Sequence, residues 1–437
     1  MTRLHIPSIQ SERVTKLLET HNVDPVTRAR ALNRLATVAS GKTCRLFVLK
    51  QHRCFVLALV ITACLGSAGL ASATGRGSGD TIRVGAVSSL TGLASFPESS
   101  AAVRAYFDMI NASGGIRGRK LELIVEDDRG EAQQARMAAQ KVIDDPRVVA
   151  LVGNASIVDC LMNGGSYQEA GLIALHGTAV EFACFASSHI IPVNVGAYRS
   201  FRNGMQFARD VLRARRTCAF LFETPGMRPG YQAMVDSWQK QTGTPIHHLA
   251  YFGPTSDVNG LVRQAEAKQC DAVVYTGVEP QVLAWARAAQ QVQALAKVPT
   301  IFNAPAYTER VANELGETGA PIYCMSEFEP WSSRSPTLTD WRSVMKRGNV
   351  PLSSFSQGGY TAAQLFVRTL RGIEGEITRA RVADAMRAVR DMELPMIGMR
   401  FTVGNRPAHN PNRATLPMKL EEGKWRIADP FWVVGPE

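Results

Sequence analysis

The segment from Ile110 to Asp128 constrains the fold more than any other part of this 437-residue chain. Apolar residues recur at helical spacing over Ala101–Asn111, and a Gly-Gly-Ile-Arg-Gly turn follows at 114–118. Glycine can adopt the left-handed backbone that ends a helix. The next run, Leu121–Val125, has the length and composition of a strand and ends in carboxylates. With the alternating Ile82–Val87 stretch ahead of it, this segment predicts one strand–helix–strand unit.

The alternation of strands and helices continues along the chain. Val148–Gly153 is wholly apolar, as is typical of a strand in a parallel sheet that is covered on both faces. The pattern therefore predicts an α/β doubly wound architecture, and at about 150 residues per domain the length allows two or three domains. The further helices are predicted over 132–144, 232–242, 281–292 and 356–372, and the further strands over 171–175, 216–223 and 270–277.

The order of these features resembles type I periplasmic binding proteins, and within them the branched-chain amino acid branch that serves ABC transporters. The resemblance rests on the Leu90–Gly92 loop, the glycine turn, the acids at 126–128 and the Gly-Tyr-Thr-Ala-Ala start of the late helix at 359–363. It extends from about Thr81 to the C-terminus. It implies two Rossmann-like lobes joined by a multi-strand hinge with three crossovers. The implied N-terminal lobe is 81–197 plus 329–393, the C-terminal lobe is 198–328 plus 394–437, and closing strands are expected at 399–403 and 423–426.

The N-terminal segment has the pattern of an export signal. Basic residues precede the apolar run Cys54–Leu65, and small residues follow at Ala71–Ala73, so we predict a secretory signal peptide over 44–73 and a periplasmic protein. The apolar run is shorter than the roughly 20 residues of a membrane span. Ile61–Cys64 also resembles a lipoprotein cleavage box, which would leave a lipid on Cys64. Residues 1–43 are interpreted as an unstructured or misassigned extension.

The net charge of +11 is concentrated in this leading segment. Residues 1–73 contain ten Lys or Arg and three Asp or Glu, so 39 basic and 35 acidic residues remain, a net charge of +4. We found no basic stretch interleaved with aromatic residues, as a nucleic-acid groove would need. Nucleic acid is therefore not an expected partner.

Five cysteines follow the signal segment. Cys160 should begin the helix after one strand and Cys184 should lie in the loop after the neighbouring strand, so we predict a disulfide between them in an oxidising compartment. Cys218 and Cys270 begin two strands expected to be adjacent, and either a bridge or two small buried residues would suit that placement. With Cys324 the number is odd, and no spacing resembles a CxxC pair, so no metal site is predicted.

Ligands of open α/β sheets bind beyond the carboxyl ends of the strands, where helix N-termini expose N–H groups that favour anions. Ser156, Gly177 and Thr178 follow two neighbouring strands, and the resemblance places them where the family holds a ligand carboxylate. The alternative is that Ser156 and Thr178 only cap helices. Phe96 matches a position where the family presents an aromatic side chain to the ligand, although ordinary packing would also explain it.

The opposite wall, where we predict ligand contacts for Met227, Pro305 and Tyr307, departs from the family pattern. Met227 lies in a loop that usually carries a Tyr-Gly pair, and the loop with Pro305 and Tyr307 lacks the acid that usually pairs with a ligand ammonium. Burying an ammonium without a partner costs several kcal/mol. Either Glu279 supplies the charge from the neighbouring loop, or the ligand has no ammonium. We favour the second reading. For Glu279 itself two roles stay open, a contact with the ligand or a solvated acid at a helix N-terminus.

These observations predict a solute receptor and not an enzyme. The chain contains no Gly-x-Ser-x-Gly, His-Glu-x-x-His or Walker motif, and we predict neither catalytic residues nor a cofactor. We expect a small carboxylate-bearing solute, which is an amino acid or a related acid or amide, to bind between the lobes. The lobes would close on the solute, and the closed form would bind to an ABC transporter with permease and ATPase subunits. The alternative is a ligand-sensing receptor subunit without a transport role. We expect a monomer that associates with the membrane only through the permease or a lipid on Cys64.

Overall fold

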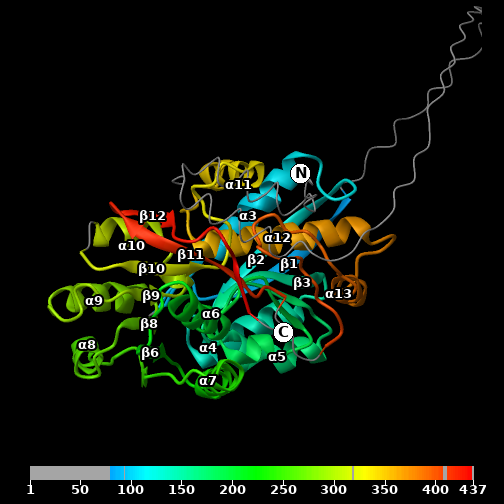
Figure 1. The fold of residues 1–437 in the computed structure, drawn as a ribbon. Coiled ribbons are helices and arrows are strands. Elements are labelled where there is room, and N and C mark those ends of the chain that lie inside the picture. The colour runs from blue at the N-terminus through cyan, green and yellow to red at the C-terminus, as the bar shows by residue number, and fades with distance from the viewer. Residues whose placement is uncertain (1–78, 93, 317–318, 407–410, 436–437) are drawn as a thin grey trace, which may run out of the picture. The chain divides into compact units, whose positions relative to one another are not determined.

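The computed structural model describes residues 79–437, apart from 93, 317–318, 407–410 and 436–437 (Figure 1). The predicted signal peptide, the extension before it and Cys64 lie outside the described residues. Asp80–Glu437 forms one compact unit that contains a five-stranded and an eight-stranded sheet. The α/β prediction with two doubly wound sheets is confirmed. No helix within the described ranges is long and apolar enough to cross a membrane.

The first sheet has the strand order β2-β1-β3-β4-β5, and its β1–β3, β3–β4 and β4–β5 pairs are parallel. β3 is buried along its whole length, as its apolar sequence predicts. α12 and α3 lie side by side and pack on this sheet, and α13 contacts β3 (Figure 1). Its elements are β1 Gly79–Ser88, α3 Pro97–Ala112, β2 Arg119–Asp127, α4 Ala132–Asp144, β3 Val148–Ser156, α5 Asp159–Glu169, β4 Ala174–Ala179, η1 Phe182–Phe185, β5 Ile190–Pro192, α11 Pro336–Arg347, α12 Ser354–Gly372 and α13 Arg379–Arg387.

The second sheet has the order β12-β11-β10-β9-β8-β6-β7, with β13 paired to β11. Strands β6 to β10 pair in parallel, whereas β11 runs antiparallel to β10 and β12. Its elements are α6 Ala197–Asp210, β6 Thr217–Phe222, α7 Arg228–Thr242, β7 His248–Phe252, α8 Val258–Ala267, β8 Ala272–Thr276, α9 Glu279–Gln290, β9 Thr300–Phe302, η2 Ala304–Ala306, α10 Glu309–Leu315, β10 Ile322–Ser326, β11 Ala414–Glu421, β12 Lys424–Ile427 and β13 Val433–Val434.

One expected closing strand is absent from the described residues. Phe401 makes only an isolated bridge to Met392, so 399–403 is not a strand, and β11 and β12 form the end of the second sheet instead. Phe401 and Val403 are buried in the core of the first sheet. Buried and exposed residues alternate in this segment, as they do in a strand. The alternation arises because the side chains of Phe401 and Val403 pack into the core, although their backbone does not pair with a sheet.

Three connecting segments meet between the two sheets: 193–196 after β5, 327–328 after β10, and 412–413 before β11. Buried Asn412 joins them, because its Nδ2 donates to Val193 O at 3.1 Å and to Glu327 O at 3.3 Å. The side chain of Glu327 reaches back to the first segment, where its Oε1 accepts from Gly196 N at 2.8 Å. A single amide therefore ties all three connections together.

Glycines let α12 approach β4 and α3 closely. A Cβ on Gly358 would lie 2.1 Å from Gly177 O, and a Cβ on Gly359 would lie 2.0 Å from Ser99 O. Contacts this short do not occur between real atoms, so these positions exclude any side chain. A capping box between Ser353 and Ser356 begins the helix. The first turn of α12 is thereby held at the carboxyl end of β4.

Two disulfides are present, Cys160–Cys184 and Cys218–Cys270, and Cys324 is free and buried. The first pair is the one expected from the sequence, and it links the start of α5 to η1. The second links the start of β6 to the residues just before β8, which pairs with β6. Both bridges therefore fasten neighbouring parts of one sheet.

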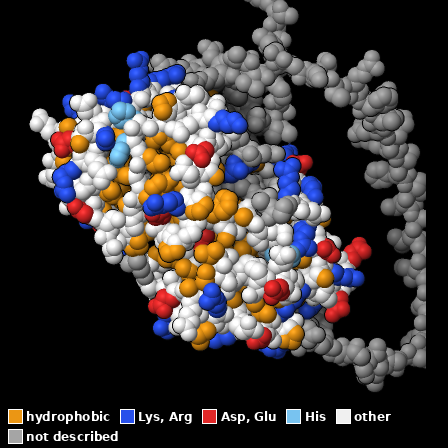
Figure 2. All heavy atoms as spheres, turned by 90° about the horizontal axis from the view of Figure 1, so that it is seen from below, with side chains coloured by type: hydrophobic (Ala, Val, Ile, Leu, Met, Phe, Trp, Pro, Cys, Tyr) orange, Lys and Arg blue, Asp and Glu red, His pale blue; other side chains and the backbone are white. Residues whose placement is uncertain are grey.

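The face of the protein in Figure 2 carries basic and acidic side chains interspersed among hydrophobic patches. This mixture agrees with the modest net charge of the sequence after residue 73.

Candidate functional site: a cavity between two sheets

A cavity of about 50 Å³ lies where strand ends of the two sheets face each other. Since one water needs about 10–15 Å³ of such space, the cavity has room for roughly three to five waters or a solute of similar size. Its walls come from the ends of β4, β6 and β8 and from the residues after β9 and β10. They are formed by Phe96, Gly177, Thr178, Ala179, Val180, Asn194, Gly196, Ala197, Phe222, Met227, Tyr231, Thr276, Gly277, Val278, Asn303, Ala304, Pro305, Glu327, Ser354 and Phe355.

The wall on the side of the first sheet combines aromatic rings with hydroxyls. Phe96, immediately before α3, packs on Phe355 in the first turn of α12 with ring centroids 5.0 Å apart. Thr178, near the end of β4, and Ser354 line the cavity beside them. Among the described residues neither hydroxyl makes a side-chain hydrogen bond within the protein. Both hydroxyls are therefore available to a solute.

The wall on the side of the second sheet is mostly apolar but carries oriented polar groups. The Thr276 hydroxyl accepts from Phe222 N at 2.8 Å and from the Tyr231 hydroxyl at 3.1 Å, so its position is fixed. Asn303 Oδ1 accepts from Gly277 N at 3.3 Å, and its Nδ2 donates to no described residue. Met227 lines this wall with its thioether turned toward Thr224 N.

Glu327 is the one carboxyl of the lining, and sequence reasoning missed it. It follows β10, is only 5% exposed, and accepts hydrogen bonds from Gly196 N and the Asn194 side chain. Burial raises its pKa to about 7, although these hydrogen bonds act in the opposite direction. The lining contains no Lys, Arg or His. The cavity therefore holds a titratable negative group without a positive side chain among its walls.

Five of the eight predicted ligand residues line this cavity: Phe96, Gly177, Thr178, Met227 and Pro305. Gly177 also has a packing role, because its backbone lies in close contact with Gly358 at the start of α12.

Ser156 does not line the cavity. It is fully buried, and its hydroxyl accepts from Val158 N at 3.0 Å and Asp159 N at 3.1 Å. These bonds satisfy N–H groups at the start of α5, which is the capping alternative considered for this residue.

Glu279 and Tyr307 are also absent from the lining, for different reasons. Glu279 lies in the first turn of α9, and its carboxylate is 3.0 Å from the Arg310 guanidinium, so a cation already pairs with it. Tyr307 is fully buried and stacks on Trp331 with ring centroids 3.8 Å apart. The first residue is neutralised and the second belongs to the core of the second sheet.

Comparison with known proteins identifies the family. The model of the periplasmic binding protein family matches residues 81–424. The chain belongs to this family.

Relatives of this periplasmic binding protein include an amino acid binding protein of Pseudomonas aeruginosa, which is 25% identical over 269 residues. That match covers 58% of this chain and 66% of the relative, slightly less than two thirds of its length. Similar solved structures include a possible leucine/isoleucine/valine-binding protein of Rhodopirellula baltica, at TM-score 0.69 and 18% identity, covering 80% of this chain and 96% of the other.

Two further solved structures have the same fold. A branched-chain amino acid transporter substrate-binding protein of Streptococcus pneumoniae, solved with isoleucine, has TM-score 0.66 and 17% identity and covers 81% of this chain and 99% of the other. A fatty acid ABC transporter substrate-binding protein of Thermomonospora curvata has TM-score 0.69 and 19% identity and covers 80% and 92%.

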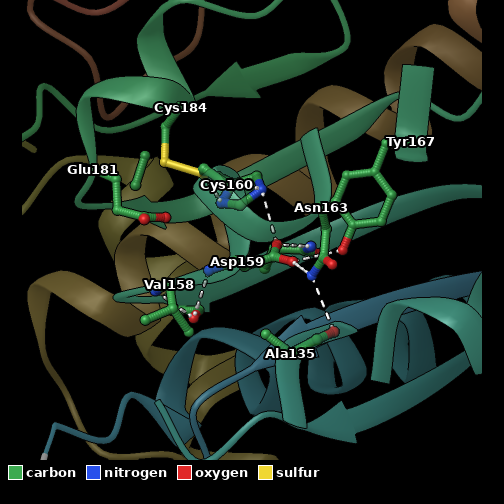
Figure 3. A network of polar contacts seen from close by, with 12 residues as sticks. Ala135, Val158, Asp159, Cys160, Asn163, Tyr167, Glu181 and Cys184 are labelled. Carbon is green, nitrogen blue, oxygen red and sulfur yellow. Dashed lines mark hydrogen bonds and ion pairs between the residues drawn. A yellow bond between two sulfur atoms is a disulfide. The ribbon is translucent and has the colours of Figure 1, made fainter. Parts of the chain in front are cut away.

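In this binding protein a buried polar network joins α5 to the neighbouring strands β3 and β4 (Figure 3). Asp159 is fully buried and accepts from Tyr167 at 2.6 Å, Asn163 at 2.7 Å and Asn154 at 2.9 Å. His176 lies 3.4 Å from Asp159, and burial lowers the pKa of His176 to about 3, so it is neutral.

The Cys160–Cys184 bridge lies next to His176, whose Nδ1 is 3.6 Å from Cys160 Sγ. Because the two sulfurs are bonded to each other, neither can act as a thiolate ligand for a metal. The cluster serves to hold α5 against β3 and β4.

Proposed function

We propose that this periplasmic binding protein is the solute-binding component of a branched-chain amino acid type ABC transporter and that it binds a small carboxylate-bearing solute without transforming it. The observation that carries the proposal is the small cavity between the strand ends of two sheets, lined by the Thr178 and Ser354 hydroxyls, which make no side-chain hydrogen bond to any described residue. The isoleucine-bound neighbour and the amino acid binding relative support the solute class.

The carboxylate of the solute would lie against the first wall. Thr178 and Ser354 offer hydroxyls there, and the first turn of α12, a helix of 19 residues, adds the positive end of the helix dipole. The aromatic pair Phe96 and Phe355 and the apolar residues opposite would hold the hydrocarbon part.

The two sheets would act as lobes, 81–197 plus 329–403 and 198–328 plus 414–437, that close on the solute by rotation about the three connecting segments. The first lobe extends beyond the expected boundary at 393, because Leu394, Phe401 and Val403 are buried in the core of the first sheet. Closure would create the surface recognised by a permease with its ATPase subunits. In this proposal the chain is exported by the signal peptide at 44–73 and acts as a periplasmic monomer, either free or held by a lipid on Cys64.

A ligand screen tests the proposal directly. The full coding sequence would be expressed, and the protein purified from the extracytoplasmic fraction would be heated with amino acids, aliphatic and aromatic acids, amides or urea. A ligand at 100 times its Kd stabilises the fold by about 2.7 kcal/mol, which raises the melting temperature measurably. If no member of the panel shifts the melting temperature, the solute-receptor proposal is wrong.

Thr178→Val tests the carboxylate position. The variant keeps the side-chain shape and removes the hydroxyl, so affinity should fall by about 1.5–3 kcal/mol, the contribution of a hydrogen bond to a charged group. Ser156→Ala is the matched control because its hydroxyl caps α5 behind the wall. The control should lose stability but retain affinity in calorimetry. Equal losses of affinity in both variants would contradict this placement.

A further inference from the structure

We propose that Glu327 binds the positive charge of the ligand, so that the solute taken by this cavity is a zwitterion with an ammonium group and not a simple acid. The inference rests on the proposed function, which it narrows to one class of solute. It also replaces our expectation from the sequence that the ligand carries no ammonium.

The charge of the cavity favours a ligand with a positive group. Among its twenty lining residues Glu327 is the one carboxyl, and none is Lys, Arg or His. A simple carboxylic acid would bring a second negative charge into a small space that offers no cation. A ligand ammonium would instead neutralise the carboxylate.

Hydrogen-bond donors of the connecting segment 193–196 hold the Glu327 carboxylate in place. Gly196 N donates to its Oε1 at 2.8 Å, and the Asn194 side chain and the backbone of Val195 also donate to the carboxylate. These donors suit the ionised form, because an ionised carboxylate only accepts hydrogen bonds. All of these donors belong to the connecting segment 193–196, and the carboxyl group of Glu327 also borders the cavity. A buried charge held in this way lacks only a cation, and a charge without one is costly.

No other carboxyl among the lining residues could pair with a ligand ammonium. Asn303, which lines the opposite wall, carries an amide, and the Glu279 carboxylate is already paired with Arg310 outside the lining. Thr178 and Glu327 border the same cavity of about 50 Å³. A solute of a few heavy atoms that contacts the Thr178 hydroxyl with its carboxylate can therefore reach Glu327 with a neighbouring ammonium, as in an α-amino acid.

The test compares matched ligands in calorimetry. Glycine and alanine match the small cavity, whereas valine, leucine and isoleucine would need its two walls to move apart. Each of these amino acids is paired with the acid that lacks only the amino group, such as alanine with propanoate. The wild-type protein should bind at least one amino acid at least about 30-fold more tightly than its desamino partner. Glu327→Gln should abolish this preference, mainly by weakening the amino acid.

Glu181→Gln is the matched control. Glu181 is also a buried carboxyl with a raised pKa, but it does not line the cavity, so the ligand preference should be unchanged. If the wild-type protein binds the desamino acid as tightly as the amino acid, this inference is wrong while the solute-receptor proposal stands. If it binds no member of either series, the proposed function fails for these solutes and this inference fails with it.

A measurement on the wild-type protein keeps the test independent of any variant. An ammonium ligand requires ionised Glu327, so affinity for the amino acid should rise about tenfold per pH unit below pH 7 and level off above it. The desamino acid should show the opposite trend, because it prefers the protonated carboxyl. The titratable neighbours Cys324 and Tyr231 stay neutral here, because burial raises the pKa of both. A flat profile for the amino acid would contradict the inference.

Discussion

Replacing Gly359 by alanine should destabilise the protein, although alanine is the better helix former. The added Cβ would lie 2.0 Å from the carbonyl oxygen of Ser99 and 2.7 Å from its carbon, whereas real Cβ contacts under 3.0 Å are essentially never seen. Both partners are backbone atoms of packed helices, so α12 would have to move away from α3 by about 1 Å or more.

The magnitude follows from two opposing effects. Overpacking of this kind costs about 1–3 kcal/mol and sometimes more, and a backbone-to-backbone clash belongs at the upper end. Alanine recovers about 1 kcal/mol of helix propensity. We therefore expect a net loss of about 2 kcal/mol. The first turn of α12 would move with the helix, so Ser354 and Phe355 would shift and ligand affinity would fall as well.

Urea denaturation of Gly359→Ala and of two controls would measure the effect. Gly372→Ala, at the end of the same helix, and Gly165→Ala, inside α5, place their Cβ atoms in open space. Gly372→Ala should be nearly neutral and Gly165→Ala should gain up to about 1 kcal/mol. A Gly359→Ala variant as stable as the wild type would refute the packing argument.

Three other predictions concern separate parts of the molecule. Glu279→Gln should leave ligand affinity unchanged in calorimetry, because Glu279 pairs with Arg310 outside the cavity; a loss above tenfold would return it to the site. Removing the Cys218–Cys270 bridge by a double serine substitution should lower the free energy of unfolding by about 4 kcal/mol in the loop-entropy model, given the separation of 52 residues; an unchanged denaturation midpoint would contradict this. Burial raises the pKa of Glu181 to about 8, so the folded state retains a proton that the unfolded state releases near pH 4.5. This contribution to stability is present at low pH and is lost as the pH rises to about 8, and Glu181→Gln should flatten that decline in melting temperature.

The fold could be predicted from the sequence largely because local signals agreed with one another. The helix at 132–144 was predicted with the ends that α4 has, since helical spacing and Pro146 both define it. The segment 399–403 misled because burial of alternate residues does not require a sheet. Apolar periodicity reports which side chains are buried, and it does not report what their backbone pairs with.

The site was harder to predict because a position at a strand end does not determine where a side chain points. The Ser156 hydroxyl accepts from N–H groups of α5, and the Glu279 carboxylate pairs with Arg310. Because of these local contacts, neither side chain points into the cavity. Glu327 gave no signal because its environment depends on Gly196, 131 residues earlier in the chain. A single sequence without its fold does not bring these two residues together.

The amide of Asn412, which bonds to both Val193 O and Glu327 O, has a consequence for motion. If the sheets swing as rigid bodies, the place where all three connections are fastened lies close to the rotation axis and travels least. The Glu327 carboxylate, which lies near that axis, would keep its position when the sheets open, whereas Thr178 and Asn303 on the two opposite walls would move apart. The ammonium group of the ligand would then bind to Glu327 first. The other contacts with the ligand would form only when the two sheets close.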